Sequence, residues 1–333
     1  MKVLVILLAA VALCAGSALL IPGDNSHYVE GESRYIWMPD DNNVAKLVDL
    51  QEPVDDVALA ENRRGADNTY WLFTRRNPHF RQIITNGNAM SVHNTNYDGA
   101  KATKVIVHGW NNNGDSPVNN YIRESFLANG DHNVIVLDWS RLANQGYNTA
   151  VAAVPDVGRT LGNFIQWLIN TGGGNWNRVH FVGHGLGAHI VGNAGRQVGN
   201  RAMRVTGLDP AGPKWGGNPD ALNRNDGVYV EAIHTDGRVL GIMYPIADAD
   251  FYPNNGRAPQ PGCVFDNVCA HERAFLLFAS SVRSNHFIGI QCKDLQQAEQ
   301  CRCTGAELRM GNADLTKRGH GLFCLRTRSI WPF

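Results

Sequence analysis

The sequence lacks several features that would point to other classes of protein. It contains no Asn-x-Ser/Thr sequon, so N-linked glycosylation is not expected. Its 30 basic and 30 acidic side chains give a formal net charge of zero, which argues against nucleic acid as a partner. No apolar run reaches the roughly 20 residues that span a bilayer, so we expect no integral membrane segment.

The N-terminus has the pattern of a secretory signal. One basic residue, Lys2, precedes an apolar run over 3–13, and small residues follow at 15–18. This pattern predicts a signal peptide over residues 1–17 that is cleaved on export, which makes the protein secreted and extracellular. We expect residues 18–333 to form one domain.

Cysteine is absent from the mature chain before residue 263, and the six cysteines that remain lie close together. An even number in a secreted chain predicts three disulfides. We expect Cys263 to pair with Cys269, and we favour Cys292 with Cys303 and Cys301 with Cys324, although the pairing of these last four stays open. A zinc site is the alternative, but Cys301-Arg302-Cys303 lacks the usual C-x-x-C spacing.

Apolar strands alternate with helical segments through most of the chain. After an acidic, loop-like arm, strands are predicted at 70–74, 105–107, 134–137, 179–182, 205–208 and 228–233. Helices are predicted to begin at Ser116-Pro117 and to cover 147–169, with a bend at Pro155, then 187–198 and 271–282. Continuous apolar strands separated by helices indicate an α/β fold with a mostly parallel sheet covered on both faces.

Two segments break this alternation. Residues 237–261 are rich in Gly, Pro and Asn and carry apolar side chains that we expect to be exposed. Such a long irregular segment is typical of a lid or a binding loop. The cysteine-rich segment after Asn285 is predicted to be a disulfide-stapled end piece of the same domain.

One pentapeptide, Gly183-His184-Gly185-Leu186-Gly187, stands between a predicted strand and a predicted helix. That context is typical of the nucleophile elbow G-x-S-x-G, but Gly185 occupies the serine position, and 183–189 contain no other serine. Asp209 and His271 follow in the order nucleophile, acid, base that α/β-hydrolases use. We predict that His184 and His189 are packing residues.

Seven segments together resemble the pancreatic-lipase family, most closely its insect members and the related phospholipases A1. They stand in the family's order: Val107-His108-Gly109-Trp110, Leu137-Asp138-Trp139-Ser140, 183–189, 207–213, Ile233-His234-Thr235-Asp236, 250–254 and Cys269-Ala270-His271-Glu272-Arg273. The resemblance implies an α/β-hydrolase fold with a catalytic acid at Asp209 and a base at His271. It also implies an oxyanion hole formed by the backbone amides of Trp110 and Leu186.

The chain departs from this family in four respects. Gly185 leaves the nucleophile position vacant, and the stretch 245–250 differs from the residues that relatives usually carry beside the lid. We also expect no C-terminal β-sandwich domain after the lipase-like domain. Of the acidic positions that form a calcium loop in some relatives, only Asp226 is retained, beside Asn223. We therefore expect neither a metal nor another cofactor.

Without an oxygen at residue 185 no acyl-enzyme can form. Our first hypothesis is therefore a secreted, catalytically silent homologue that binds a lipid or fatty-acyl ligand in a cleft under 237–261, with a lipid interface as a further candidate partner. The second is an active carboxylic-ester hydrolase, a triacylglycerol lipase or phospholipase A1, in which His271 activates water. The third is a yolk or storage protein.

Overall fold

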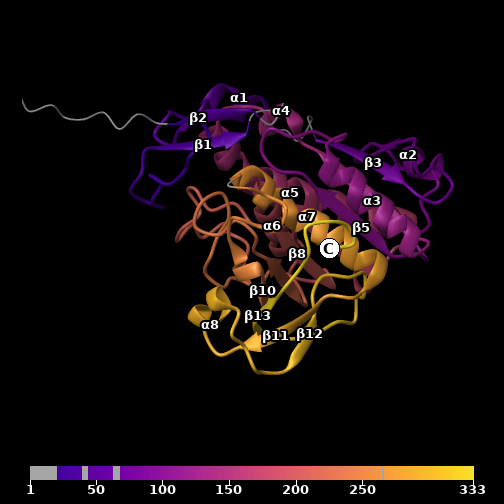
Figure 1. The fold of residues 1–333 in the computed structure, drawn as a ribbon. Helices are drawn as coiled ribbons and strands as arrows, with labels where there is room; N and C mark the ends of the chain where they lie inside the picture. The colour runs from indigo at the N-terminus through magenta and orange to yellow at the C-terminus, as the bar shows by residue number, and fades with distance from the viewer. Residues whose placement is uncertain (1–20, 40–43, 63–67, 265) are drawn as a thin grey trace, which may run out of the picture.

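The computed structural model describes residues 21–39, 44–62, 68–264 and 266–333. The expected signal peptide, residues 1–17, lies outside them. Helices and strands alternate along most of the chain (Figure 1). The strands are β1 (Tyr35–Pro39), β2 (Ala45–Asp49), β3 (Thr69–Phe73), β4 (Gln82–Ile84), β5 (Thr103–Val107), β6 (Asn133–Asp138), β7 (Val179–His184), β8 (Arg204–Leu208), β9 (Val230–Ile233), β10 (Ala249–Pro253), β11 (Ile288–Cys292), β12 (Glu307–Arg309) and β13 (Gly321–Leu325).

The central sheet has eleven strands within the described residues, in the order β12-β11-β13-β10-β9-β8-β7-β5-β6-β3-β4. The seven strands from β13 to β6 are parallel to their neighbours. Both edges are antiparallel, through β3 and β4 on one side and β11 and β12 on the other. Because the carboxyl ends of parallel strands meet at one edge, the residues that follow β5, β7 and β8 converge there.

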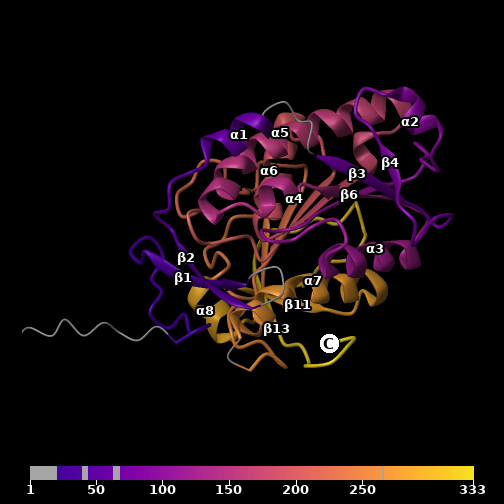
Figure 2. The ribbon, with the colours of Figure 1, turned by 90° about the horizontal axis from the view of Figure 1, so that it is seen from above.

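Helices cover both faces of this sheet, as predicted. Figure 2 shows α5 and α6 on one face and α3 and α7 on the other. The inner strands are buried throughout because helices pack on both sides of them, which explains why their central residues are mostly apolar. The helices are α1 (Asp56–Asn62), α2 (Ala89–His93), α3 (Pro117–Asn129), α4 (Ser140–Ala143), α5 (Tyr147–Gly172), α6 (Leu186–Gln197), α7 (Asn267–Ser284) and α8 (Leu295–Gln300), with short 3-10 turns η1 (Trp176–Arg178) and η2 (Asn254–Gly256).

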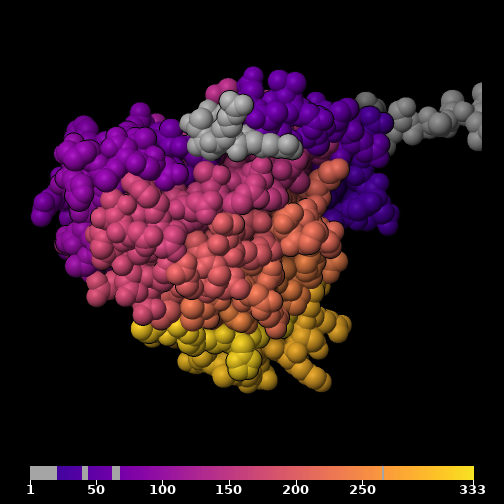
Figure 3. All heavy atoms as spheres, turned by 180° about the vertical axis from the view of Figure 1, so that it is seen from behind, coloured from indigo at the N-terminus to yellow at the C-terminus, as the bar shows by residue number. Residues whose placement is uncertain are grey.

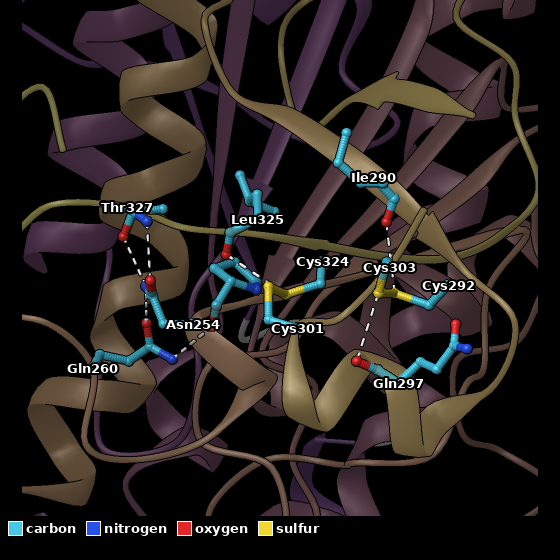
Figure 4. The surroundings of a disulfide bond; sticks show 11 residues. Asn254, Gln260, Ile290, Cys292, Gln297, Cys301, Cys303, Cys324, Leu325 and Thr327 are labelled. Atoms are coloured by element: carbon cyan, nitrogen blue, oxygen red, sulfur yellow. Dashed lines mark hydrogen bonds between the residues drawn. A yellow bond between two sulfur atoms is a disulfide. The ribbon is translucent and has the colours of Figure 1, made fainter. Parts of the chain in front are cut away.

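The segment after Asn285 joins the main sheet through β11, β12 and β13 and carries two of the three disulfides. The pairs are Cys263–Cys269, Cys292–Cys303 and Cys301–Cys324, which are the pairs favoured from the sequence. Figure 4 shows the second and third of them near η2, where the side chain of Asn254 donates to Gln260 and Thr327. This segment is therefore a stapled part of the α/β domain.

Three sequence-based expectations were wrong. The arm predicted to be loop-like contains the β1–β2 hairpin and α1, and it lies at the opposite end of the molecule from the C-terminal segment (Figure 3). The segment 237–261 contains β10 and η2, and its apolar side chains at 240, 242, 243 and 246 are buried, whereas Tyr244 is exposed as expected; the segment as a whole is therefore not an exposed lid. Helix α7 begins at Asn267, and His271 is therefore inside the helix.

Among the described residues, no helix combines the length and apolar character that crossing a membrane requires.

A buried ionic cluster anchors the C-terminal segment to the amino end of the sheet. Arg204 of β8 and Glu231 of β9 are both fully buried, with Arg204 Nη2 2.9 Å from Glu231 Oε1. Lys317 also pairs with Glu231, and Arg204 donates to the carbonyls of residues 311, 312 and 314. Glu231 is thus the single carboxylate that neutralises two buried cations within this cluster.

Replacing Glu231 by Gln is expected to lower the free energy of unfolding by about 3–5 kcal/mol, because two buried cations lose their counter-charge. Denaturant melts would measure the loss. The control is Asp115→Asn, which breaks an exposed pair with Arg81 and should change stability by less than about 1 kcal/mol. Equal effects from the two variants would contradict this account.

Candidate functional site

The predicted elbow is present, with Gly185 at the turn between β7 and α6. Gly185 has φ 57° and ψ −119°, a conformation that side-chain-bearing residues rarely adopt. The turn also requires close backbone contact: a Cβ on Gly183 would lie 2.1 Å from the carbonyl oxygen of Gly187. The glycines on either side therefore let α6 begin directly against the sheet.

The acid and base predicted from the sequence are brought together at this turn. His271 Nδ1 lies 2.6 Å from Asp209 Oδ2, across 62 residues of sequence. Asp209 follows β8 and is fully buried, while His271 is slightly exposed at its site on α7. This hydrogen bond orients the imidazole so that its other nitrogen, Nε2, faces Gly185.

Backbone amides hold the Asp209 carboxylate in place. Its Oδ1 accepts from the amides of Thr235 at 2.7 Å and Asp236 at 3.0 Å, which follow β9. Asp209 itself has φ 39°, so the backbone is turned sharply to present the side chain. The neighbouring Asp236 is buried too, and burial together with the charge of Asp209 raises the pKa of Asp236.

The two backbone amides predicted to form an oxyanion hole are not used in other hydrogen bonds within the described residues. Leu186 is the first residue of α6, so its amide has no carbonyl within the helix to bind. The amide of Trp110, after β5, makes no hydrogen bond to another described residue. The Trp110 ring is fixed by its Nε1, which donates to the Gln145 carbonyl at 2.9 Å, and by an edge contact with Tyr147.

A cavity of about 350 Å³ opens in front of Gly185 and His271. Its walls come from several elements: the β1 hairpin, the loop after β5, α3, the start of α6 and α7. Most of the side chains that line it are apolar or aromatic, including Met38, Trp110, Leu186, Leu240, Val268 and Phe275. The cavity is therefore a space of mixed polar and apolar lining beside His271.

The position of a missing nucleophile can be located from the backbone of Gly185. A Cβ built there would lie 3.1 Å from His271 Nε2 and 3.6 Å from its Cε1. A serine at this position would therefore place its hydroxyl at the base, which is the arrangement of nucleophilic acyl transfer. With glycine, the pair of Asp209 and His271 has no side-chain nucleophile at the elbow.

The two other histidines near the elbow have structural partners. His184 packs on His271 with ring centroids 4.2 Å apart, and burial followed by the charge of His271 holds the pKa of His184 well below its usual value. His189 stacks on Trp215, with Nε2 bonded to the Ala211 carbonyl and Nδ1 accepting from the Leu222 amide. His189 packs in the core behind the elbow, whereas His184 also lines the cavity in front of it.

The calcium-loop residue Asp226 is bound by its own chain. Its Oδ2 accepts from the Asn223 amide at 2.8 Å, and its Oδ1 lies 3.4 Å from Arg196 Nε. Within the described ranges, no group of three or more His, Cys, Asp or Glu side chains is placed to hold a metal. The absence of a metal and of other cofactors remains a prediction.

The sequence did not reveal the contribution of the N-terminal arm to the site. Met38 and Pro39 of β1 line the cavity, and the side-chain amide of Asn111 donates to the Pro39 carbonyl at 3.1 Å. No motif marks these residues, because they contribute shape and a backbone carbonyl rather than a reactive group. Conversely, only Leu240 represents the expected lid segment 237–261 in the cavity wall.

The parallel sheet, the elbow after β7 and the acid and base after β8 and on α7 define an α/β-hydrolase fold. Parts of solved structures agree only locally; an acetyl xylan esterase from Aspergillus awamori matches 43% of this chain and 65% of that chain, with 13% identity and a TM-score of 0.30. Because this TM-score is low, the fold assignment rests on the topology of the sheet and on the chain order of Gly185, Asp209 and His271.

The Lipase family model matches residues 39–333, so the chain belongs to the lipase family. It is 35% identical to lipase member H-A of Xenopus laevis, over 70% of this chain and 52% of that protein. It is 29% identical to human pancreatic lipase-related protein 2, over 76% and 59%, and 31% identical to rat lipoprotein lipase, over 74% and 59%. The chain thus spans between half and three fifths of these relatives.

A methyl group at the elbow should destabilise the protein. Gly185→Ala is expected to lower the free energy of unfolding by about 1–3 kcal/mol, because alanine must adopt the strained conformation and its Cβ crowds His271. The control, Gly199→Ala, also has positive φ but meets nothing within 4 Å, and should cost less. Denaturant melts would compare them, and a neutral Gly185→Ala would contradict the expected strain.

Acidification should destabilise the protein through His189. Burial lowers its pKa to about 3, so the unfolded chain, with a pKa near 6.5, binds a proton first. The free energy of unfolding should therefore fall as the pH drops below about 6.5, by about 1.4 kcal/mol per pH unit for this group. His189→Gln should reduce that slope by one proton, measured by melts at several pH values; an unchanged slope would exclude His189 as a source.

Proposed function

We propose that this chain is a secreted, catalytically silent member of the lipase family that binds a fatty-acyl lipid in the cavity at Gly185. Family membership and an apolar-walled cavity beside the acid and base support a lipid ligand. The three disulfides support an oxidising compartment and hence secretion, with residues 1–17 as the signal and residues 18–333 as the lipase-like domain.

The observation that carries the proposal is the elbow itself. Gly185 has the nucleophile's backbone conformation and lies against His271 Nε2, yet it provides no oxygen for a covalent intermediate. In serine hydrolases, loss of one triad member leaves only about 10³–10⁴-fold acceleration over water, from binding and the oxyanion hole. The cavity and the two free amides can still bind an ester or an acyl carboxylate, so binding is the function that remains.

An active hydrolase is the second candidate, and one observation favours it. Asp209 and His271 keep the geometry of an acid–base pair, so His271 Nε2 is directed toward the cavity and is placed to activate a water molecule. In that case the protein would hydrolyse a carboxylic ester without an acyl-enzyme. The substrate would be a triacylglycerol or a phospholipid that fits the same cavity.

Restoring the nucleophile separates these two candidates. Gly185→Ser should gain hydrolysis of a short-chain nitrophenyl ester or a phospholipid, by about 10³-fold or more in kcat/KM over the natural protein. Gly185→Ala is the matched control, since it adds the same Cβ and backbone strain without an oxygen, and it should stay at background. The measurement is initial rates on all three secreted proteins.

Either of two results would overturn the proposal. Turnover by the natural protein that disappears in His271→Ala would identify the water-activating hydrolase instead. Failure to find an acyl lipid by mass spectrometry of the purified protein, together with no binding of an added fatty acid, would remove the ligand. If Gly185→Ser folds but does not turn over, the amides of Trp110 and Leu186 do not form a working oxyanion hole.

A further inference from the structure

Two parts of the surface carry opposite charge, although the chain as a whole is formally neutral. The N-terminal arm is acidic, since residues 24–67 contain eleven carboxylates and four lysine or arginine side chains, a formal charge of −7. The segment 75–97 is basic, since it contains three arginines, two histidines and no carboxylate. Each part also exposes large apolar side chains. Opposite charges combined with exposed apolar groups are typical of surfaces that dock on one another.

The acidic patch lies at the start of α1 and consists of Glu52, Val54, Asp55, Asp56 and Val57. All five residues are exposed, and Val57 is 69% exposed. The side chains of Glu52 and Asp56 make no hydrogen bond or ion pair to another described residue. Asp55 Oδ1 accepts from two amides of α1. The patch therefore presents carboxylates whose charge no neighbouring cation neutralises.

The basic patch lies on the turn before β4, on β4 itself and on α2, and consists of Arg76, His79, Phe80, Ile83 and Met90. All five residues are exposed, and Phe80 is 80% exposed. The side chains of Arg76 and His79 likewise have no partner within the part of the chain that the structure describes. This patch thus combines free donors with a larger apolar surface than the acidic patch has.

Hydrogen bonds fix the turn before β4 and α2 relative to each other. Asn77 Nδ2 donates to the Phe80 carbonyl at 2.9 Å, and Asn77 Oδ1 accepts from Asn96 Nδ2 at 3.0 Å. The Thr85 amide donates at 2.9 Å to Oγ of Ser91, which belongs to α2. The basic patch is therefore a preformed surface, and docking on it does not require the backbone to become ordered first.

The two patches of one copy cannot meet, because they lie at opposite ends of α5. The Asp55 amide donates to Thr149 Oγ1 in the first turn of α5, whereas Tyr97 packs against Gly172, the last residue of that helix. A helix of 26 residues is about 39 Å long. Figure 2 shows α1 and α2 toward opposite ends of this helical layer. Charges so far apart are screened from each other at physiological salt, where the Debye length is about 8 Å.

We propose that the basic patch of one copy of this chain docks head to tail on the acidic patch of a second copy. The charges are complementary, and each patch offers exposed apolar side chains for the centre of the contact. The formal net charge of zero leaves no long-range repulsion between copies. Because the two patches differ, each contact leaves one acidic and one basic patch free, so association continues into a chain or closes into a ring.

Sedimentation velocity at increasing protein concentration tests this contact. The mean sedimentation coefficient of the natural protein should rise with concentration at about 0.01 M salt. The dissociation constant should be about tenfold higher at about 0.15 M salt, because the Debye length falls from about 30 to about 8 Å. Glu52→Lys/Asp56→Lys and Arg76→Glu/His79→Glu should each remain monomeric at low salt. A one-to-one mixture of these two variants should associate again, because the patch that each retains binds the patch that the other retains.

Single changes provide the matched control. Asp56→Lys should weaken association, whereas Glu307→Lys, which reverses an exposed carboxylate of β12, should leave it unchanged. A natural protein that stays monomeric at low salt would overturn the proposal, and so would association that neither salt nor the patch variants reduce. Failure of the mixed variants to associate would exclude head-to-tail pairing and would indicate contact between like surfaces instead.

Discussion

The site depends on one steric constraint, the approach of α6 to β5 and β7 at Gly183 and Gly187. A Cβ on Gly187 would lie 2.3 Å from the Val107 carbonyl oxygen, and one on Gly183 would meet the Gly187 carbonyl. Only an approach of this kind places the first amide of α6 beside the end of β5. Leu186 and Trp110 therefore line one cavity, whether or not residue 185 carries a hydroxyl.

Asp209 and His271 contribute to the stability of the fold for a reason that is independent of catalysis. Asp209 is fully buried, and its carboxylate is satisfied by two backbone amides and by the His271 imidazole. Removing one of those donors would leave a buried carboxylate short of a partner, at a cost in stability. Natural loss of the nucleophile is different, because glycine relaxes the turn at Gly185. A lipase-type site can thus carry glycine at the nucleophile position and keep its architecture.

Much of the fold could be predicted from the sequence because local pattern and tertiary structure agree in its centre. The buried parallel strands have mostly apolar sequences, and Asp209 and His271, which the order of the motifs selected, lie together beside Gly185. The arm and segment 237–261 were misjudged for a different reason. In the β1–β2 hairpin, Ile36 and Met38 are buried because they pack against the core of the domain. Leu240 and Ile242 are likewise buried by elements that are distant in sequence. Neither contact leaves a local pattern.

Residues from distant parts of the chain form the cavity wall, which affects when the cavity can form during synthesis and folding. Its lining runs from Met38 to Phe275, and β10 pairs with β13, at the far end of the chain. Such distant pairings form slowly, and a chain emerging from the ribosome folds its N-terminal parts first. No fragment that stops before α7 possesses the pocket. Ligand occupancy would therefore report that synthesis and folding of the whole domain are complete.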